Sequence, residues 1–147
     1  MTTWDLEKLV CQLASRDEWN RRWIKKPLSE SPFFLTLKHK DKKIFQDYYG
    51  ILTDDRRPGG ALNRNELTYD GFMDLYEDVK KNGIRDISTI MIHKNYEHII
   101  ADGQHRLAIL LHLGEKEIIL PDASTAETNT SGKNCFVEMI FPVSLKK

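Results

Sequence analysis

The feature with the clearest chemical potential is a short polar loop, Asp102-Gly103-Gln104, between a β-rich run and an apolar helical segment. The first turn of a helix presents unpaired backbone N–H groups and about half a positive charge, and a glycine there allows close approach of an anion. His105 and Arg106 would add cationic donors, because an arginine can bind two phosphate oxygens at once. The loop therefore predicts a phosphate site formed by Gly103, Gln104, His105 and Arg106.

The same residues also have a plain structural explanation. In that interpretation Gly103 is only a turn residue and Arg106 is a surface hydrogen-bond donor. The four-residue pattern Gly103-Gln104-His105-Arg106 is short enough to occur by chance. It therefore does not decide between a phosphate site and an ordinary turn. Cations in a first helical turn are unfavourable with respect to the helix dipole, which favours a compensating anion.

The elements next to this loop would have to position it. Runs rich in β-forming residues at 89–93 and 98–101 predict a β-hairpin. A strong helical segment, 105–113, follows the loop and ends at Gly114. Upstream, Thr68 is a suitable N-cap for a helix that ends at Gly83. Its apolar stripe has helical spacing and consists of Phe72, Leu75, Tyr76 and Val79.

The two ends of the chain complete the expected fold. Apolar residues at 6, 9, 10 and 13 and a capping-box pattern at 15–18 predict two short helices, the second carrying Trp19 and Trp23. Residues 33–37 are expected to form a short strand after several breaker residues. Towards the C-terminus we expect strands at 117–120 and 135–141, joined by the polar loop 121–134.

These features together give a resemblance to a known family. The order helix, Gly83-Ile84, hairpin, Gly-x-x-Arg loop and helix, closed by Leu113-Gly114, resembles the ParB/sulfiredoxin superfamily over roughly residues 64 to 120. The chain is most similar to the free serine kinase branch, where an Asp-Gly-x-His-Arg loop holds nucleotide phosphates. The resemblance implies a compact α/β (α+β) domain with a small mixed sheet and flanking helices. Residues 33–147 would form this core and 1–32 an N-terminal helical extension, within a single domain.

The resemblance also implies a reaction. A kinase of this type transfers the terminal phosphate of ATP or another nucleoside triphosphate to a hydroxyl of a small molecule. His105 and Arg106 would neutralise charge on the transferring group, and Mg²⁺ would bridge phosphate oxygens, with Asp102 orienting the loop or approaching the metal. A glutamate upstream of the preceding helix is the catalytic base in that branch. Glu66 falls at nearly the matching distance before Gly83, although it would equally suit an exposed loop.

The sequence departs from the family patterns at some positions, and these departures restrict the expected function. Sulfiredoxins carry a cysteine where this chain has Gln104, which excludes sulfinic-acid repair. We expect no plasmid partitioning, because partition proteins have a more basic loop and a downstream helix-turn-helix domain for which the chain, ending at Lys147, leaves no room. The serine kinases usually have a histidine at the position of Gln104, so serine is not secured as the substrate.

Basic residues elsewhere keep a second function open. Arg56, Arg57 and Arg64 bracket a Gly-rich loop near Glu66, where they would contact the acceptor or phosphate, or form a solvated loop. Residues 21–43 carry a surplus of Lys and Arg that would face an anion or simply be a solvated surface. The alternative function is therefore a non-catalytic nucleotide- or nucleic-acid-binding module, regulatory or nuclease-related.

The composition of the chain limits the classes of function to be considered. The 147 residues carry 22 Lys+Arg against 22 Asp+Glu, and this balance argues against a dedicated DNA-coating protein. Without a long apolar run or a leader-like N-terminus, we expect a soluble, cytoplasmic protein with no membrane span. Cys11 and Cys135 are expected to be ordinary buried thiols, and the five histidines form no metal signature. The oligomeric state is not indicated.

Overall fold

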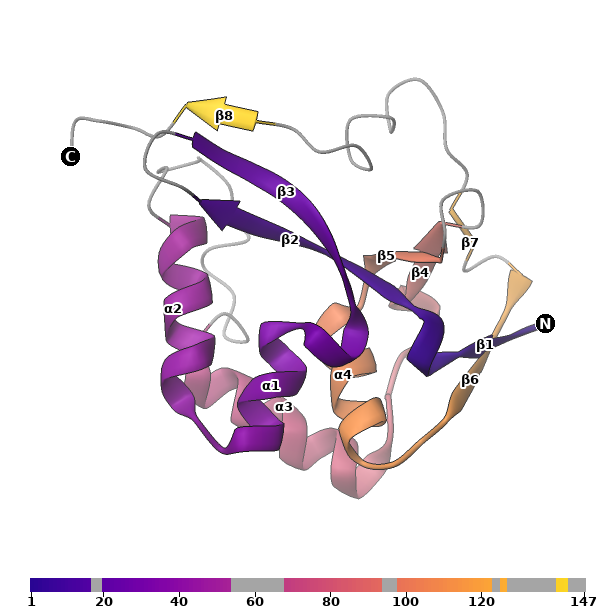
Figure 1. Ribbon diagram of the computed structural model, residues 1–147. Helices are drawn as coiled ribbons and strands as arrows, with labels where there is room; N and C mark the ends of the chain where they lie inside the picture. The colour runs from indigo at the N-terminus through magenta and orange to yellow at the C-terminus, as the bar shows by residue number, and fades with distance from the viewer. Residues whose placement is uncertain (17–19, 54–67, 94–97, 123–124, 127–139, 143–147) are drawn as a thin grey trace.

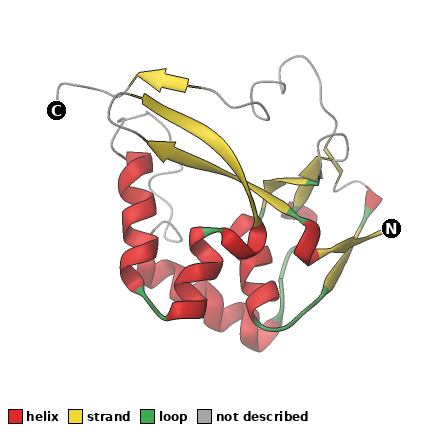
Figure 2. Cartoon of the chain, in the orientation of Figure 1, coloured by secondary structure: helices red, strands yellow, loops and turns green. Residues whose placement is uncertain are grey.

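Helices and strands divide into two layers. The computed structural model describes residues 1–16, 20–53, 68–93, 98–122, 125–126 and 140–142. Within these ranges, helices gather against one side of a curved, mixed β-sheet (Figure 1), and the same division is plain when the chain is coloured by secondary structure (Figure 2). The expected α+β class, with a small mixed sheet and flanking helices, is confirmed.

The described strands form two sheets. The larger has the order β7-β4-β5-β2-β3-β8 and is mixed, because β2 runs parallel to β5 and β4 parallel to β7 while the other neighbours are antiparallel. The smaller is an antiparallel pair of β1 with β6. The strands are β1 Thr2–Asp5, β2 Val10–Arg16, β3 Asn20–Pro27, β4 Met91–His93, β5 Ile99–Asp102, β6 Glu117–Leu120, β7 Thr125–Ala126 and β8 Ile140–Pro142.

Aromatic side chains from several helices pack together in the helical layer. Phe45 stacks on Phe72 with ring centroids 4.8 Å apart, and Phe33 lies edge-on to Tyr48. Such rings bury large apolar areas and fix the distances between helices. The helices are α1 Pro32–His39, α2 Lys42–Thr53, α3 Tyr69–Asn82 and α4 Gln104–His112, and the short 3₁₀ segments are η1 Leu6–Lys8, η2 Leu28–Glu30 and η5 Ile87–Thr89. Among the residues that the structure describes, no helix has the length and apolar character needed to cross a membrane.

The N-terminal region differs from the sequence prediction. Residues 2–16 form β1, η1 and β2 instead of a helix, and the segment predicted to carry the second helix contributes β3, with residues 17–19 outside the described ranges. The helical prediction was wrong because the apolar positions there satisfy two periods. Leu9, Cys11 and Leu13 are buried at every second position, which is the strand period. These side chains belong to the hydrophobic core, so residues 1–32 are not a helical extension.

The strand predicted at 33–37 is a helix. Ser31 caps α1 by accepting a hydrogen bond from the backbone N–H of Phe34 at 3.1 Å, and Pro32 occupies the first helical position. A capping serine followed by proline is a strong start signal for a helix. This start signal outweighs the β-forming character of residues 33–37. The apolar run is too short for its periodicity to distinguish a strand from a helix.

The elements around the polar loop agree with the sequence. Thr68 caps α3 through the N–H of Gly71, and Gly83 ends it with a φ of 74°. The runs around 94–97 form the antiparallel pair β4–β5. α4 begins one residue earlier than expected, and Gly114 follows its end with a φ of 98°. The strand at 117–120 is confirmed as β6, and the described part of the C-terminal strand is β8.

The thiol of Cys11 is sealed in the core. Its side chain is fully buried on β2, and burial raises the pKa of the thiol from 9.0 to about 12, although a hydrogen bond with Ser31 partly opposes the rise. A protonated, inaccessible thiol is a poor nucleophile. The expectation of an ordinary buried cysteine is confirmed at this position, whereas Cys135 lies outside the described residues.

This burial predicts a loss of stability at alkaline pH. Unfolded Cys11 ionises near pH 9.0 while the folded thiol stays protonated to about 12, so its contribution is fully present below pH 9 and is lost as the pH rises. The limiting slope for one group is about 1.4 kcal/mol per pH unit. Urea unfolding of wild type and Cys11→Val from pH 8 upwards measures it. We expect a shallower decline in the variant, and identical slopes would contradict the assignment.

Candidate functional site

The polar loop is a sharp turn from the end of β5 into α4. Gly103 is the N-cap of α4 with a φ of 102°, and its carbonyl accepts the first helical hydrogen bond from Leu107 at 2.9 Å. In the described ranges no side chain caps this helix, whereas Ser31 and Thr68 cap α1 and α3. The first-turn N–H groups of a helix have no partner within it. The start of α4 is therefore suited to accept an anion.

Two independent constraints require glycine at position 103. Its φ lies in the left-handed region that side chains disfavour, and a Cβ there would approach Ile90 Cγ1 to 3.0 Å. The loop is thus wedged against Ile90, which directly precedes β4. This close fit positions the backbone of the loop against the sheet.

Substitution of Gly103 is consequently expected to destabilise the fold. Gly103→Ala is expected to lower the free energy of unfolding by about 1–3 kcal/mol, from the cost of an unfavourable backbone conformation and the contact with Ile90. Gly114→Ala is a useful comparison, because its φ of 98° is close to that of Gly103 but a Cβ there would meet no atom within 4 Å. Thermal or urea unfolding should show the larger loss at 103. An equal or smaller loss at 103 would contradict the wedge against Ile90.

Arg106 is held by the segment that precedes β4. Its Nη1 donates to the Asp86 carbonyl at 3.4 Å and to the Thr89 hydroxyl. The Asp86 carboxylate in turn caps η5 by accepting the N–H of Ser88. Arg106 Nε and Nη2 make no hydrogen bond with the described residues. The guanidinium is thus anchored through one nitrogen and retains further donors for a ligand.

The side chain of His105 is directed into the helical layer. Its Nε2 lies 2.6 Å from the hydroxyl of Tyr49 on α2, and its ring meets Phe33 edge-on with centroids 4.4 Å apart. It also packs near Phe45 and Phe72. The ring therefore ties α4 to the neighbouring helices, while the His105 backbone remains in the first turn. The expected role of this side chain in neutralising phosphate charge stays a prediction.

Gln104 lies where two parallel strands separate. β2 and β5 have one residue pair in register, Val10 with Ile99. Further along β2, side chains replace the strand partner: the Gln12 carbonyl accepts from Gln104 Nε2 at 3.4 Å, and the Ala14 N–H donates to the Tyr48 hydroxyl at 3.0 Å. The start of α4 thus borders this separation. In open α/β sheets, ligands bind beyond the carboxyl ends of the strands.

Asp102 is the acidic residue of the loop. It ends β5, lies opposite Met91 of β4 and is exposed. Over the described ranges, no group of three or more His, Cys, Asp or Glu side chains gathers as a metal site. Mg²⁺ bound to phosphates needs one or two carboxylates and water, not a protein cage. An exposed carboxylate beside a helix N-terminus fits that requirement.

The remaining candidates fall in one connecting segment. Glu66, Arg56, Arg57 and Arg64 lie within residues 54–67, outside the described residues. Their roles as base and as substrate or phosphate contacts stay predictions. The segment joins α2 to α3, the helices that supply Tyr49 and Phe72 around His105.

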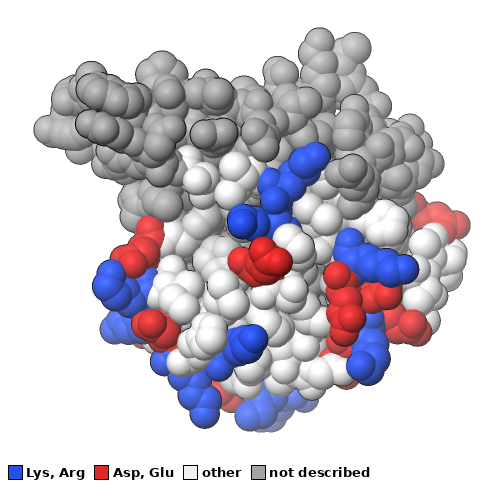
Figure 3. Space-filling view, in the orientation of Figure 1, with Lys and Arg blue, Asp and Glu red and all other residues white. Residues whose placement is uncertain are grey.

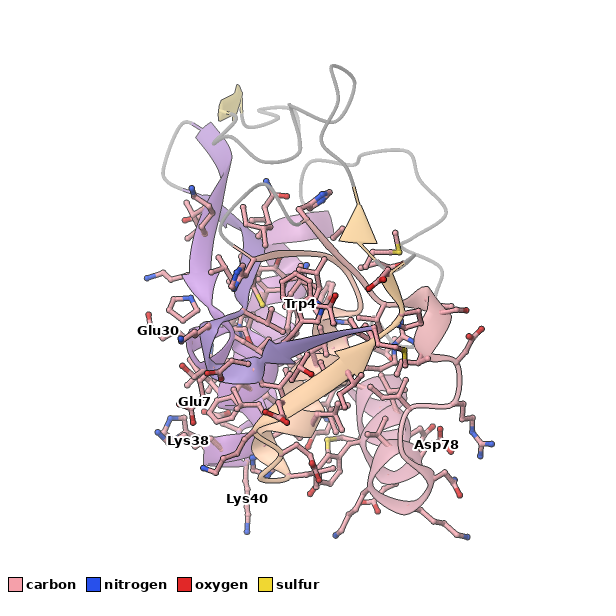
Figure 4. The ribbon with its side chains drawn as sticks, turned by 90° about the vertical axis from the view of Figure 1, so that its right-hand side faces the viewer. Trp4, Glu7, Glu30, Lys38, Lys40 and Asp78 are labelled. Carbon is pink, nitrogen blue, oxygen red and sulfur yellow. The ribbon has the colours of Figure 1, made fainter. Side chains whose placement is uncertain are left out.

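The described cations of the basic stretch are divided between two places. Lys25 and Lys26 lie on β3, whereas Lys38, Lys40, Lys42 and Lys43 surround the junction of α1 and α2. Lys43 forms an ion pair with Asp47 at 2.8 Å. Basic and acidic side chains alternate on the face shown in Figure 3, and Glu7 and Glu30 lie on the same side as Lys38 and Lys40 in Figure 4. The face shown in Figure 3 therefore carries both charges among the described side chains.

Protein-family models, curated proteins and solved structures were each searched, and none matches the chain.

Proposed function

We propose that the start of α4 binds the phosphates of a nucleoside triphosphate, and that the protein transfers the terminal phosphate to a hydroxyl of a small molecule. The observation that carries the proposal is the junction at Gly103. The left-handed conformation of Gly103 and its close fit against Ile90 set the path of the backbone into α4, and no described side chain caps this helix, so its first-turn N–H groups are left for a ligand. A helix start of this kind attracts phosphate through its backbone N–H groups and its dipole.

The neighbouring side chains support this assignment. Arg106 has donors without a described partner and is anchored through Nη1, which reduces the entropy lost when it binds phosphate. The Asp102 carboxylate would approach Mg²⁺ bound to the phosphates, where the ion neutralises charge on the transferring group. Phosphoryl transfer depends mainly on such positioning and charge stabilisation.

Transfer rather than binding alone is proposed from the resemblance to the ParB/sulfiredoxin superfamily. In the free serine kinase branch, a glutamate upstream of the preceding helix takes the proton of the acceptor hydroxyl. Glu66 falls at nearly the matching distance before Gly83, and it precedes α3 by a few positions. A correctly placed general base contributes about a hundred- to ten-thousand-fold in rate.

Nucleic-acid binding is the competing function. The mixed charges on the face shown in Figure 3 and the zero net charge of the chain favour a small ligand instead. Salt dependence separates the two functions, because a protein that binds DNA releases condensed counterions and its affinity for DNA therefore falls steeply as the salt concentration rises. Fluorescence anisotropy with labelled DNA and calorimetry with MgATP, each at several salt concentrations, would make the comparison.

The reaction itself is tested by a product screen. Small hydroxyl compounds are incubated with the protein, Mg²⁺ and either ATP or CTP, and mass spectrometry detects a phosphorylated product. We expect product from at least one hydroxyl compound, together with the nucleoside diphosphate in equal amount. Tight nucleotide binding without any product would support a non-catalytic binding module instead.

A further inference from the structure

One buried polar atom next to the proposed phosphate site has no hydrogen-bond partner among the residues that the structure describes. Gln104 Oε1 is shielded from solvent, and no described residue donates a hydrogen bond to it. A buried acceptor without a donor is unfavourable, and native structures rarely retain one without a reason. The side-chain carbonyl of Gln104 is therefore a candidate acceptor for a ligand group.

The orientation of this amide is determined by its other end. The Gln12 carbonyl can only accept a hydrogen bond, so the Gln104 atom that faces it must be the Nε2 donor. At 3.4 Å this hydrogen bond is long and holds the amide weakly. The terminal torsion of glutamine has broad preferences, so a modest rotation would bring Oε1 towards a ligand.

The chemistry of Oε1 selects the kind of group that it would accept. Ionised phosphate oxygens have no proton to donate, so the carbonyl does not bind the phosphates themselves. Its partner must carry an O–H or N–H group. In a nucleotide whose phosphates rest on the first turn of α4, the sugar hydroxyls are the donors nearest to those phosphates.

We propose that Gln104 Oε1 accepts a hydrogen bond from a ribose hydroxyl of the bound nucleotide, and so makes the site selective for ribonucleotides. The inference rests on the proposed function, because it requires phosphates at α4. Under this proposal Gln104 has two roles. Its backbone N–H faces phosphate, and its side chain, next to the place where β2 and β5 separate, binds the sugar.

The test uses ligands that differ only in hydroxyl content. Calorimetry measures binding of Mg²⁺ complexes of tripolyphosphate, ATP, 2′-deoxy-ATP and 3′-deoxy-ATP to wild type and Gln104→Met. We expect Gln104→Met to weaken ATP about tenfold and tripolyphosphate less than about twofold, as for loss of one hydrogen bond. One of the two deoxy nucleotides should bind wild type about tenfold more weakly than ATP and lose nothing further in the variant.

A control variant isolates the acceptor role from loosening of the sheet. Tyr48→Phe removes a different side-chain hydrogen bond to the β2 backbone, at Ala14, and should not alter the preference for ATP over the deoxy nucleotides. Should Gln104→Met fail to fold, the deoxy nucleotides still test wild type. Equal affinity of wild type for all three nucleotides would overturn the inference while leaving phosphate binding intact. Binding of neither tripolyphosphate nor ATP would instead refute the proposed function.

Discussion

Arg106→Ala is expected to weaken the binding of MgATP by about ten- to a hundredfold, because each charge-assisted hydrogen bond contributes about 1.5–3 kcal/mol. Adenosine lacks the phosphates, so its affinity should change by less than about twofold on the same energy scale. Isothermal calorimetry with MgATP, MgADP and adenosine measures the difference. The loss should grow with the number of phosphates if the guanidinium contacts the terminal ones.

Arg106 also holds η5, and this structural role needs its own control. Thr89→Val removes the hydroxyl that accepts from Arg106 Nη1 but leaves the charge in place. We expect Thr89→Val to retain most of the MgATP affinity, and Arg106→Lys to recover part of it. Equal losses for adenosine and MgATP in Arg106→Ala, or a loss as large in Thr89→Val, would place Arg106 among the structural residues.

Glu66→Gln should separate an enzyme from a binding module. The substitution preserves shape and removes the basic oxygen, so turnover should fall by about a hundredfold or more while nucleotide affinity stays within a few-fold. Product formation is followed with the hydroxyl compound that the screen identifies, and affinity by calorimetry. Glu77→Gln, an exposed carboxylate on α3, is the matched control and should retain full turnover.

Two outcomes would change the account of Glu66. Unchanged turnover in Glu66→Gln would move the base to another carboxylate, such as Asp102 or Asp70, or remove a base from the mechanism. A loss of nucleotide affinity with no turnover in either form would favour a binding module, in which Glu66 supports the site and does not take a proton.

Local signals account for the parts of the fold that the sequence predicts well. α3 has a capping threonine at one end and glycine at the other, and α4 lies between Gly103 and Gly114. These residues act on the backbone beside them, so their effect can be deduced from the sequence. Residues 6–13 are not bracketed by a capping residue and a glycine in this way. Their apolar positions suit a helix or a strand, and pairing with β3 and β5 decides the matter.

In the candidate site, too, some residues can be identified from the sequence and others cannot. The loop from Asp102 to Arg106 is recognisable because its residues are consecutive. Its supporting partners are not, since Tyr49 meets His105 across 56 positions and Gln12 meets Gln104 across 92. Neither side chain carries a motif that would have identified it. Only the tertiary fold brings α2 and β2 within hydrogen-bonding distance of the first turn of α4.

The central claim, that phosphates bind the first turn of α4, is tested most directly by NMR titration of the backbone amides. The account predicts that Mg-tripolyphosphate and MgATP shift the amide signals of Gln104, His105 and Arg106 saturably, with the affinity found by calorimetry. The amides of Phe34 and Gly71 already donate to capping side chains at the starts of α1 and α3, and should not move. Saturable binding of either ligand that leaves the three α4 amides unshifted would contradict the account.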